Sequence, residues 1–425
     1  MRMSRQRTRR EVGGLIAASV AMIAAPAVLR AQTAARIVVI GGGFGGASCA
    51  RALHQADRKL DVTLVEANRT FTSCPLSNEV IAGLRDISAQ QFSYDRIAAE
   101  GVRVVLQAAT AIDAQAHKVT LADGTTLAYD RLVLAPGIDI DFQALQGYDE
   151  AASQLMPHAY KAGEQTLLLR QQIEAMPDGG TVAIAVPANP SRCPPAPYER
   201  ASLIAHYLKA HKPKSKVLIL DAKDSFSQQK LFEQAWQRLY PGMIERIPLS
   251  QGGRVTGVDV GTRTVVTEFG NYNPDVANVI PPQKAGRIAV IAGAVDRTGW
   301  CPVDASTFAS KLIPDVHVIG DACLGGGIPK SAGAAQAQGK ACAAVIARDL
   351  IARRSEPPPL TGICYSLVAP DYAFSLSGVY QPKGDLFAEV EGGKTSPIDA
   401  PQATRAAEAE AAASWFKALT HDAFG

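Results

Sequence analysis

The chain has 425 residues, of which 47% are hydrophobic and 20% are charged. Because a single hydrophobic core stops growing at roughly 250 to 300 residues, we expect two or three domains. This composition is typical of a well-buried globular protein, and it argues against a disordered chain and against a nucleic-acid-binding one. No repeat of solenoid length is visible.

The first 32 residues predict an export signal. A basic head that contains Arg9 and Arg10 precedes an apolar stretch over 12–29, and small residues follow at 31–34. The paired arginines indicate the twin-arginine route, which carries proteins that are already folded around a cofactor. We therefore expect a periplasmic protein, and an uncleaved membrane anchor is the alternative.

The apparent basicity of the chain belongs to this signal. Residues 1–32 contain six Arg and one Glu, so without them 43 basic and 40 acidic residues become 37 and 39. The formal net charge then changes from +3 to −2. Neither a nucleic acid nor a charged membrane surface is therefore indicated as a partner.

A dinucleotide-binding unit is predicted directly after the signal. The run 36–40 is apolar and β-branched, as a buried parallel strand should be, and a helical pattern covers 47–57. Between them, Gly41 permits a tight turn, Gly43 lets the backbone approach a pyrophosphate, and Gly46 allows close packing of helix and strand. A glycine fingerprint in this context predicts a bound dinucleotide.

A second predicted strand at 61–65 strengthens this interpretation. It ends in Glu66, twenty residues after Gly46, where a dinucleotide fold places a carboxylate that binds the ribose. The alternative is that Glu66 is an ordinary solvent-facing residue.

Two later segments favour FAD over NAD. Apolar strands are predicted over 129–134 and 316–319, and the second leads into Gly320 and Asp321. Both segments resemble the returning segments of flavoproteins with two dinucleotide-binding domains, where the aspartate binds the ribityl chain. A mere turn residue is the alternative role of Asp321.

Lys330 and Ser331 open a helix of small residues after this segment. The amide groups at the start of that helix could stabilise negative charge on a reduced flavin. We therefore include both residues in the predicted FAD site.

The middle of the chain lacks an NAD fingerprint. A strand is predicted over 181–186, but the proline-rich segment 187–195 follows it where a pyridine-nucleotide reductase would have its second set of glycines. Proline offers no N–H to a phosphate, and its ring blocks close approach. We therefore expect that NAD(P)H is not a substrate.

The cysteines lack the spacing of common metal or haem motifs. No C-x-x-C pair occurs, which excludes zinc ribbons, thioredoxin-type sites and a c-type haem on this chain, so we expect neither metal nor haem here. The odd total means that at least one thiol is free or bonded to something else. The seven are Cys49, Cys74, Cys193, Cys301, Cys323, Cys342 and Cys364.

Four segments in order resemble the flavoprotein subunit of flavocytochrome c sulfide dehydrogenase, in the sulfide:quinone oxidoreductase-like family of flavoproteins with two dinucleotide-binding domains. The resemblance covers about 34–425. The segments are Cys74-Pro75-Leu76-Ser77-Asn78-Glu79-Val80, Arg192-Cys193-Pro194-Pro195-Ala196-Pro197-Tyr198-Glu199-Arg200-Ala201, Gly299-Trp300-Cys301-Pro302-Val303-Asp304 and Cys364-Tyr365-Ser366.

The resemblance implies roles for four residues. Cys74 matches the cysteine that forms a thioether to the 8α-methyl group of FAD, and a free buried thiol is the alternative. Cys193 and Cys364 match the pair that forms a redox disulfide over the flavin, and a purely structural disulfide is the alternative. Glu199 matches a candidate base beside that disulfide, and a surface carboxylate is the alternative. Cys49, Cys301, Cys323 and Cys342 lie in apolar settings and are expected to be structural.

The predicted fold class is α/β, with two Rossmann-like dinucleotide-binding domains of glutathione-reductase type and a small C-terminal α+β domain. The expected boundaries are 1–32 for the signal, 33–155 with 290–362 for the FAD domain, 156–289 for the second Rossmann-like domain, and 363–425 for the C-terminal interface domain.

The expected activity is oxidation of hydrogen sulfide, with transfer of electrons through FAD to a c-type cytochrome subunit in a heterodimer. Residues 403–425 show no basic amphipathic face, so no membrane insertion is expected. One alternative is a sulfide:quinone oxidoreductase, which shares the flavin and the cysteines. The other is a non-catalytic flavin-bearing subunit of a sulfur-oxidation complex.

Overall fold

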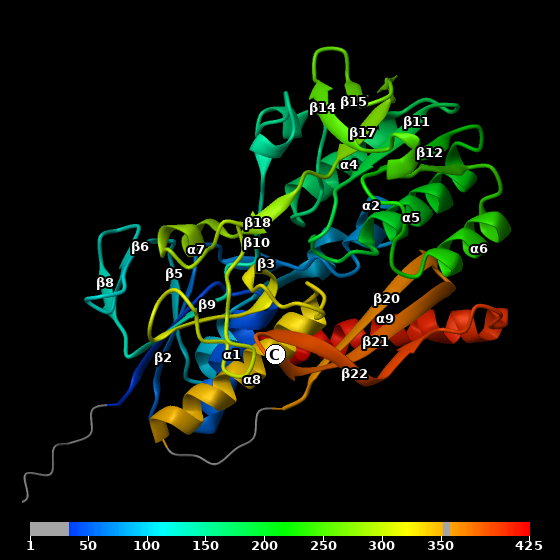
Figure 1. Cartoon of the computed structure of the whole chain (residues 1–425). Coiled ribbons are helices and arrows are strands. Elements are labelled where there is room, and N and C mark those ends of the chain that lie inside the picture. The colour runs from blue at the N-terminus through cyan, green and yellow to red at the C-terminus, as the bar shows by residue number, and fades with distance from the viewer. Residues whose placement is uncertain (1–33, 352–357) are drawn as a thin grey trace, which may run out of the picture. The chain divides into compact units, whose positions relative to one another are not determined.

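Two parallel β-sheets with helices packed on them form the frame of the protein (Figure 1). The computed structural model describes residues 34–351 and 358–425, and Ala35–Gly425 forms one unit. The predicted export signal lies outside the described residues. The two sheets and a C-terminal hairpin sheet agree with the predicted fold class.

The first sheet has five parallel strands. In spatial order they are β19 (Val316–Val318), β9 (Arg131–Leu134), β1 (Arg36–Ile40), β2 (Asp61–Glu66) and β5 (Arg103–Leu106). The central strand β1 and its neighbour β2 match the predictions at 36–40 and 61–65, with β2 one residue longer, because continuous apolar runs form strands that are buried on both faces.

The helix α1 (Phe44–Ala56) begins three residues before the predicted start at 47. Gly45 and Gly46 are therefore part of its first turn, and the expectation that the helix starts after the glycines was wrong. A Cβ atom on Gly46 would lie 1.8 Å from the carbonyl oxygen of Gly41, so only glycine allows the helix to start this close to β1.

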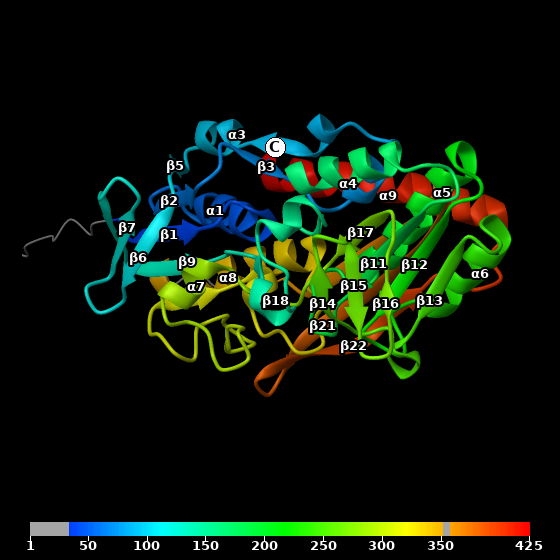
Figure 2. The same ribbon diagram turned by 90° about the horizontal axis from the view of Figure 1, so that it is seen from above.

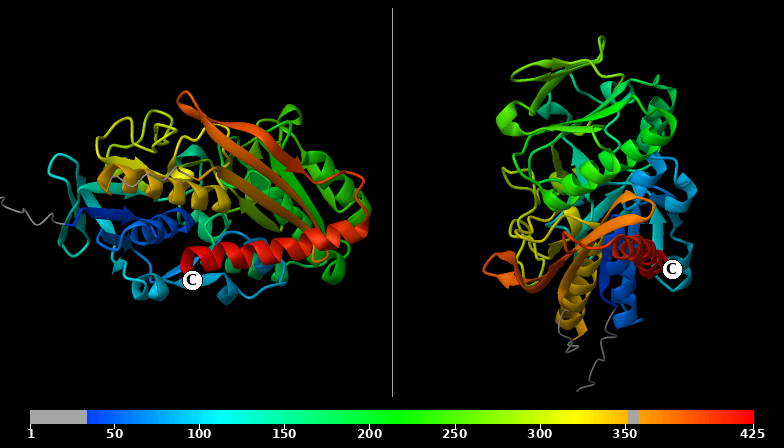
Figure 3. Two further views of the ribbon diagram at one scale, coloured as in Figure 1. Left: turned by 90° about the horizontal axis from the view of Figure 1, so that it is seen from below. Right: turned by 90° about the vertical axis from the view of Figure 1, so that its right-hand side faces the viewer.

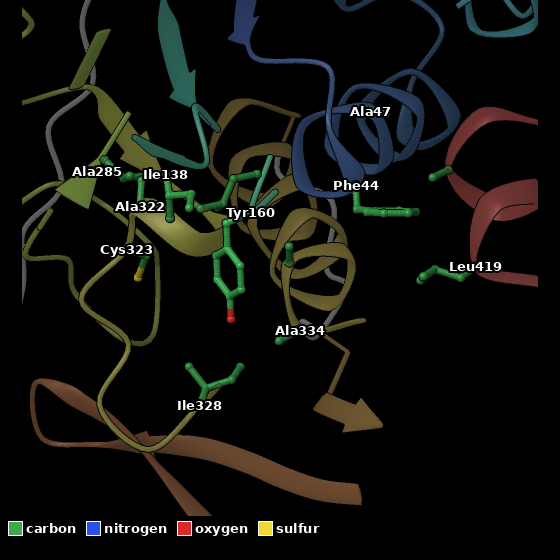
Figure 4. Close-up of a cluster of buried hydrophobic side chains, with 14 of the residues drawn as sticks. Phe44, Ala47, Ile138, Tyr160, Ala285, Ala322, Cys323, Ile328, Ala334 and Leu419 are labelled. Atoms are coloured by element: carbon green, nitrogen blue, oxygen red, sulfur yellow. The ribbon is translucent and has the colours of Figure 1, made fainter. Parts of the chain in front are cut away.

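The long helix α8 (Ala332–Ile351) packs directly against α1. A Cβ atom on Gly339 would lie 2.3 Å from the carbonyl oxygen of Gly45. Figure 4 shows Phe44 of α1, Ala334 of α8 and Leu419 of the C-terminal helix in one cluster of buried side chains. Small residues therefore bring the two helix backbones into close contact beside the first sheet.

The second sheet has four parallel strands, β13 (Ile244–Ile247), β12 (Lys216–Asp221), β11 (Thr181–Val186) and β17 (Val276–Val279). The strand predicted at 181–186 is β11. Figure 2 shows β11, β12 and β13 side by side, with α5 and α6 around them. The helices of this region are α4 (Glu164–Ala175), α5 (Ala196–His211) and α6 (Gln229–Leu239), and an antiparallel sheet consists of β14 (Val255–Asp259), β15 (Thr264–Thr267) and β16 (Asn271–Tyr272).

Smaller elements connect these parts. Strand β10 (Ile138–Ile140) pairs antiparallel with β18 (Gln283–Ala285). The other strands are β3 (Thr70–Thr72), β4 (Gln91–Ser93), β6 (Ala109–Asp113), β7 (Lys118–Leu121) and β8 (Thr126–Ala128). The short helices are α2 (Ser77–Ile81), α3 (Asp95–Ala99), α7 (Arg287–Ile291), η1 (Ile87–Gln90), η2 (Phe142–Ala144), η3 (Ala152–Gln154), η4 (Leu249–Gln251) and η5 (Gly320–Ala322).

The C-terminal region is an antiparallel sheet followed by one long helix. Its strands are β20 (Leu360–Ala369), β21 (Tyr372–Lys383) and β22 (Leu386–Thr395), and its helix is α9 (Gln402–Phe424). The sheet thus starts three residues before the expected boundary at 363.

The helix α9 runs along β21 and reaches α1, as Figure 3 shows. At its end, Phe424 stacks on Phe71 and Phe92, with ring centroids 5.0 and 5.3 Å away. Phe44 and Tyr94 complete this C-terminal aromatic cluster. Among residues 34–351 and 358–425, no helix has the length and apolar character needed to cross a bilayer.

The contact between α1 and α8 can be tested by adding one methyl group. Gly339→Ala is expected to lower the free energy of unfolding by about 1 to 3 kcal/mol, because the new Cβ has no room beside the Gly45 carbonyl. Gly333→Ala on the same helix is the control, since its Cβ would meet no atom closer than 3.5 Å. Equal thermal midpoints for the two variants would contradict this account.

Candidate active site

One cavity of about 1650 Å³ brings together most of the predicted site residues. Its lining comes from the first parallel sheet and its connections, from the loop after β11 with the start of α5, and from β20 of the C-terminal sheet. Gly46 and Lys330 do not line it. The predicted residues that do are Gly41, Gly43, Glu66, Cys74, Cys193, Glu199, Gly320, Asp321, Ser331 and Cys364.

The end of the cavity beside β1 and β2 has the features of a nucleotide site. Gly41 has a φ of +101°, which a residue with a side chain would adopt only with strain. Glu66 accepts a hydrogen bond from the N–H of Gly42 at 2.7 Å and another from the N–H of Asn68 at 2.9 Å. The carboxylate is therefore held at the glycine-rich turn, where it faces the cavity.

Asp321 lines the same cavity and has a free acceptor. Its Oδ2 accepts a hydrogen bond from Nε of Arg192 at 2.6 Å, whereas its buried Oδ1 has no hydrogen-bond partner among the described residues. A buried oxygen without a donor is costly, so this site suits a ligand that brings a hydroxyl group. The ribityl chain of FAD has such hydroxyl groups, and the residues present therefore fit the predicted cofactor.

Lys330 acts through its backbone more than through its ammonium group. Its Nζ donates to the carbonyl oxygens of Asp321 and Cys323 at 2.8 and 2.7 Å and lies over the ring of Trp300, so it faces away from the cavity. Its own carbonyl oxygen accepts the N–H of Cys193 at 2.8 Å. The carbonyl group of Lys330 therefore holds the loop that contains Cys193.

Cys193 and Cys364 approach the cavity from different elements, since Cys193 lies in the loop after β11 and Cys364 lies in β20. Burial raises the pKa of both thiols, and the proximity of Cys364 raises the pKa of Cys193 further. Ser331 is within hydrogen-bond reach of Cys364. Both cysteines are free thiols in this structure, so their disulfide stays a prediction.

The backbone is strained on both sides of this part of the cavity. Cys193 has a φ of +45° and Leu76 a φ of +62°, and neither is glycine. Such conformations cost roughly 1 to 3 kcal/mol each and are common where function requires a fixed side chain. The strained residues belong to the two loops that carry Cys193 and Cys74.

Cys74 is half-buried, and its Sγ lies 3.7 Å from Nη1 of Arg192. It therefore faces the same guanidinium group that holds Asp321. This position keeps the thiol accessible to a ligand in the cavity.

The four cysteines that were expected to be structural are buried and form two neighbouring pairs. Cys49 and Cys342 lie within hydrogen-bond reach of each other between α1 and α8. Cys301 and Cys323 are free thiols whose backbones pair in an isolated parallel β-bridge, and burial raises the pKa of each thiol to about 12. None of the four lines the large cavity.

Glu199 is buried in the first turn of α5 and is not a surface residue. Its Oε1 accepts the N–H of Leu367 at 2.9 Å, and its Oε2 accepts Nδ2 of Asn78 at 2.6 Å. Desolvation raises its pKa to about 7, against the action of both hydrogen bonds. A carboxyl group with this pKa can bind and release a proton near neutral pH.

Three side chains around these residues were given no role in the sequence analysis. Arg192 connects Asp321 with Cys74, and the hydroxyl of Tyr160 donates to the carbonyl oxygen of Arg192 at 2.7 Å. Arg200 lies next to Glu199 and is almost completely buried. The charged residues flanking Cys193 and Glu199 were a signal in the sequence, but their partners on distant elements could not be read from it.

The carboxylate that would bind the ribose of a second dinucleotide already accepts hydrogen bonds from protein side chains. Asp221, at the end of β12, is fully buried and accepts hydrogen bonds from Tyr198 Oη at 2.6 Å, Lys223 Nζ at 2.8 Å and Arg246 Nε at 2.9 Å. The ring of Tyr198 stacks on Phe226 at a centroid distance of 3.5 Å. These contacts, with the proline-rich loop after β11, support the expectation that NAD(P)H does not bind here.

Metal chemistry is not indicated by the side chains. In the described ranges 34–351 and 358–425, no group of three or more His, Cys, Asp or Glu residues is arranged to hold a metal ion.

Three family models match successive parts of the chain. Residues 166–281 match the central part of the sulfide dehydrogenase (flavocytochrome c) flavoprotein chain, and residues 356–424 match the flavin-binding part of flavocytochrome c sulphide dehydrogenase. Residues 35–169 match pyridine nucleotide-disulphide oxidoreductase.

Curated relatives agree with these models. A segment of 45 residues is 56% identical to the sulfide dehydrogenase (flavocytochrome c) flavoprotein chain of Chlorobaculum thiosulfatiphilum and covers 11% of this chain and 94% of that relative. The mitochondrial sulfide:quinone oxidoreductase of Mus musculus is 23% identical over 317 residues, which cover 71% of this chain and 68% of that protein.

Solved structures with the same fold include an oxidoreductase and a reductase. The sulfide:quinone oxidoreductase of Aquifex aeolicus has a TM-score of 0.72 at 18% identity, with 92% of each chain covered. Putidaredoxin reductase, in its covalent complex with putidaredoxin, has a TM-score of 0.64 at 17% identity, with 82% of this chain and 83% of that chain covered. These two likenesses show the fold.

The family models and the relatives agree with the glycine turn, the acceptor on Asp321 and the grouped cysteines. The chain therefore belongs to the sulfide-oxidising FAD flavoproteins that comprise the flavocytochrome c sulfide dehydrogenase flavoprotein chains and the sulfide:quinone oxidoreductases.

Proposed function

We propose that this chain oxidises hydrogen sulfide at a disulfide between Cys193 and Cys364 and passes the electrons through FAD to a c-type cytochrome subunit. The observation that carries the proposal is that these two cysteines and Glu199 line the same cavity as Asp321 and the glycine-rich turn. Sulfur chemistry and flavin binding thus have a common site.

The proposed reaction starts with hydrosulfide as the nucleophile. It attacks one sulfur of the disulfide, the S–S bond breaks, and the products are a cysteine persulfide and a cysteine thiolate. Glu199 accepts the proton of the persulfide. Removal of two electrons from the persulfide and the thiolate, for which FAD is the acceptor, forms a new S–S bond between them. The cysteine pair is then a trisulfide whose central sulfur comes from the substrate and has been oxidised by two electrons.

The electrostatics of the site favour hydrosulfide, and not a cysteine thiol, as the nucleophile. Burial raises the pKa of Cys193 and of Cys364, so a reduced pair is held mainly as neutral thiols and is weakly nucleophilic. Hydrosulfide is already an anion near neutral pH. Glu199, with a pKa of about 7, is ionised in a large fraction of molecules and can take up the proton.

FAD, when bound, supplies the two-electron acceptor for this pair. Gly41 and Glu66 would hold its nucleotide end, and Oδ1 of Asp321 would accept a hydrogen bond from its ribityl chain. Cys74 would form the thioether, since its half-buried thiol faces the cavity beside Arg192.

We also propose a c-type cytochrome as the electron acceptor and the periplasm as the location. The family models of the flavocytochrome type cover 166–281 and 356–424, and a relative of that type carries the 56% identical segment. The pattern of residues 1–32 supports export by the twin-arginine route. A quinone acceptor is the second candidate, because the relative from Mus musculus is a sulfide:quinone oxidoreductase.

Anaerobic addition of sulfide is expected to bleach the flavin absorbance of the purified protein, whereas NADH is expected to leave it oxidised. Cys193→Ser and Cys364→Ser should each slow the bleaching by more than about a hundredfold, because neither variant can form the disulfide. Stopped-flow absorbance measures the rates, and dithionite shows that each variant contains flavin. Cys49→Ala, which lies outside the cavity, should keep the wild-type rate. Wild-type rates in both serine variants would refute the mechanism.

Acid precipitation is expected to leave the flavin attached to the protein, and Cys74→Ser is expected to release it into the supernatant. The reason is that serine cannot form the thioether. Flavin absorbance of the pellet and the supernatant is the measurement. Release of flavin from the wild-type protein would show that the cofactor is bound without a covalent link.

The electron acceptor can be identified by comparing the rates at which two acceptors are reduced. Sulfide-dependent reduction of a c-type cytochrome should be at least about tenfold faster than reduction of a short-chain quinone, because α9 shows no basic apolar face for a membrane interface. Absorbance of each acceptor, with a reaction lacking sulfide as the blank, gives the two rates. The reverse ratio would favour the quinone alternative.

A further inference from the structure

The environment of Glu199 contains a side chain that is placed to control it. Asn78 lies on α2, is buried, and donates Nδ2 to Oε2 of Glu199 at 2.6 Å. The same NH₂ group also donates to the carbonyl oxygen of Ala196 at 3.2 Å. Both of its protons are thus directed at the first turn of α5.

The opposite end of the Asn78 amide is fixed as well. Its Oδ1 accepts a hydrogen bond from Nε of Arg200 at 3.0 Å. An amide group has two chemically different ends, and a cation can face only the oxygen end. Arg200 therefore determines that the NH₂ end points to Glu199.

Arg200 is itself held in one orientation by neutral acceptors. Nη1 donates to Asn278 Oδ1 at 2.8 Å and to the carbonyl oxygen of His158 at 3.1 Å, and Nη2 donates to the carbonyl oxygen of Ala159 at 2.6 Å. Asn278 in turn donates to the carbonyl oxygens of Pro157 and His158. Within the described part of the chain, Arg200 forms no direct ion pair with a carboxylate, although Glu199 is its neighbour in sequence.

From this geometry we propose that Asn78 is a positioning residue for the proton acceptor Glu199, and that Arg200 orients it. The buried guanidinium group polarises the amide, and the amide transmits this positive field to the carboxylate through a single hydrogen bond. The inference rests on the proposed function and extends it by one residue.

The charged and titratable groups around Glu199 do not replace the hydrogen bond from the Asn78 amide. From α2, Glu79 acts on it with like charge, but Glu79 is paired with Arg85 at 2.5 Å. Cys193 and Cys364 face Glu199 from the proline-rich loop and from β20. From β20 the other stabilising contact is the N–H of Leu367, which belongs to the backbone and cannot be removed by a side-chain change.

The direction of the effect follows from the chemistry of the hydrogen bond. A donor stabilises the ionised carboxylate, so loss of the Asn78 donor raises the pKa of Glu199 above its value of about 7. Loss of a hydrogen bond to a charged group corresponds to about 1 to 2 pKa units. A smaller fraction of molecules then has an ionised Glu199 at neutral pH.

The test is the pH dependence of sulfide-driven flavin reduction in the complete protein. Asn78→Ala removes the whole amide, whereas Asn78→Asp replaces the donor by a second carboxylate of the same size. The acid limb of the rate profile is expected to move up by about 1 to 2 units in Asn78→Ala and by at least as much in Asn78→Asp, where the like charge adds to the loss of the donor. Because sulfide also titrates in this range, Glu199→Gln provides the profile without the contribution of Glu199.

Ser202→Ala is the matched control. Ser202 is fully buried on the same helix and bonds to Trp236 and Tyr198 but not to Glu199, so its loss costs stability without changing the profile. Profiles of Asn78→Asp and Asn78→Ala that coincide with the profile of Ser202→Ala would overturn the inference.

A second measurement separates this inference from the proposed function. The C=O stretch of protonated Glu199, identified by its absence in Glu199→Gln, can be titrated by infrared difference spectroscopy without sulfide. Its midpoint should rise in Asn78→Ala relative to the wild-type protein. If the midpoint rises but sulfide does not reduce the flavin, the role of Asn78 is supported and sulfide is rejected as the substrate. An unchanged midpoint would reject the role of Asn78 alone.

Discussion

The ion pair between Arg192 and Asp321 holds the site together. Arg192 belongs to the proline-rich loop after the second sheet, and Asp321 follows the last strand of the first sheet, so their 2.6 Å contact joins the two halves of the chain at the cavity. Burial lowers the pKa of Arg192, but Asp321 outweighs this effect and raises it, so the guanidinium stays charged. The neighbouring residue, Cys193, is fixed by the same loop and by its bond to the Lys330 carbonyl. The position of one reactive sulfur thus depends on a contact that also serves the cofactor site.

Burial raises the pKa of the acid and of the thiols in this cavity, but the resulting protonation states near neutral pH differ. It raises the pKa of Glu199 only to about 7, because the N–H of Leu367 and the amide of Asn78 stabilise the ionised form. The thiols of Cys193 and Cys364 have no comparable set of donors, and burial keeps them neutral when reduced. The site therefore combines a carboxylate that can exchange protons near neutral pH with sulfur atoms that react best as a disulfide.

Much of the frame could be predicted from the sequence, because it depends on local patterns. The strands β1 and β11 have the predicted ends, since each is an apolar run bounded by turn-forming residues. The start of α1 was missed because glycine is a poor helix former, and only its close contact with β1 shows why it belongs to the helix. The strand β22 could not be predicted from a local pattern, because most of its side chains are exposed and it contains Gly and charged residues. The burial of Glu199 and the role of Arg192 depend on partners more than a hundred residues away, which no local pattern records.

The C-terminal aromatic cluster has a consequence for the order of events during biosynthesis. Phe424 packs against Phe44, Phe71 and Phe92, which leave the ribosome more than three hundred residues earlier. This core therefore cannot be completed until α9 has been synthesised and has left the ribosome. Removal of the last turn of α9 would expose aromatic rings beside the glycine-rich turn, far in sequence from the deletion itself.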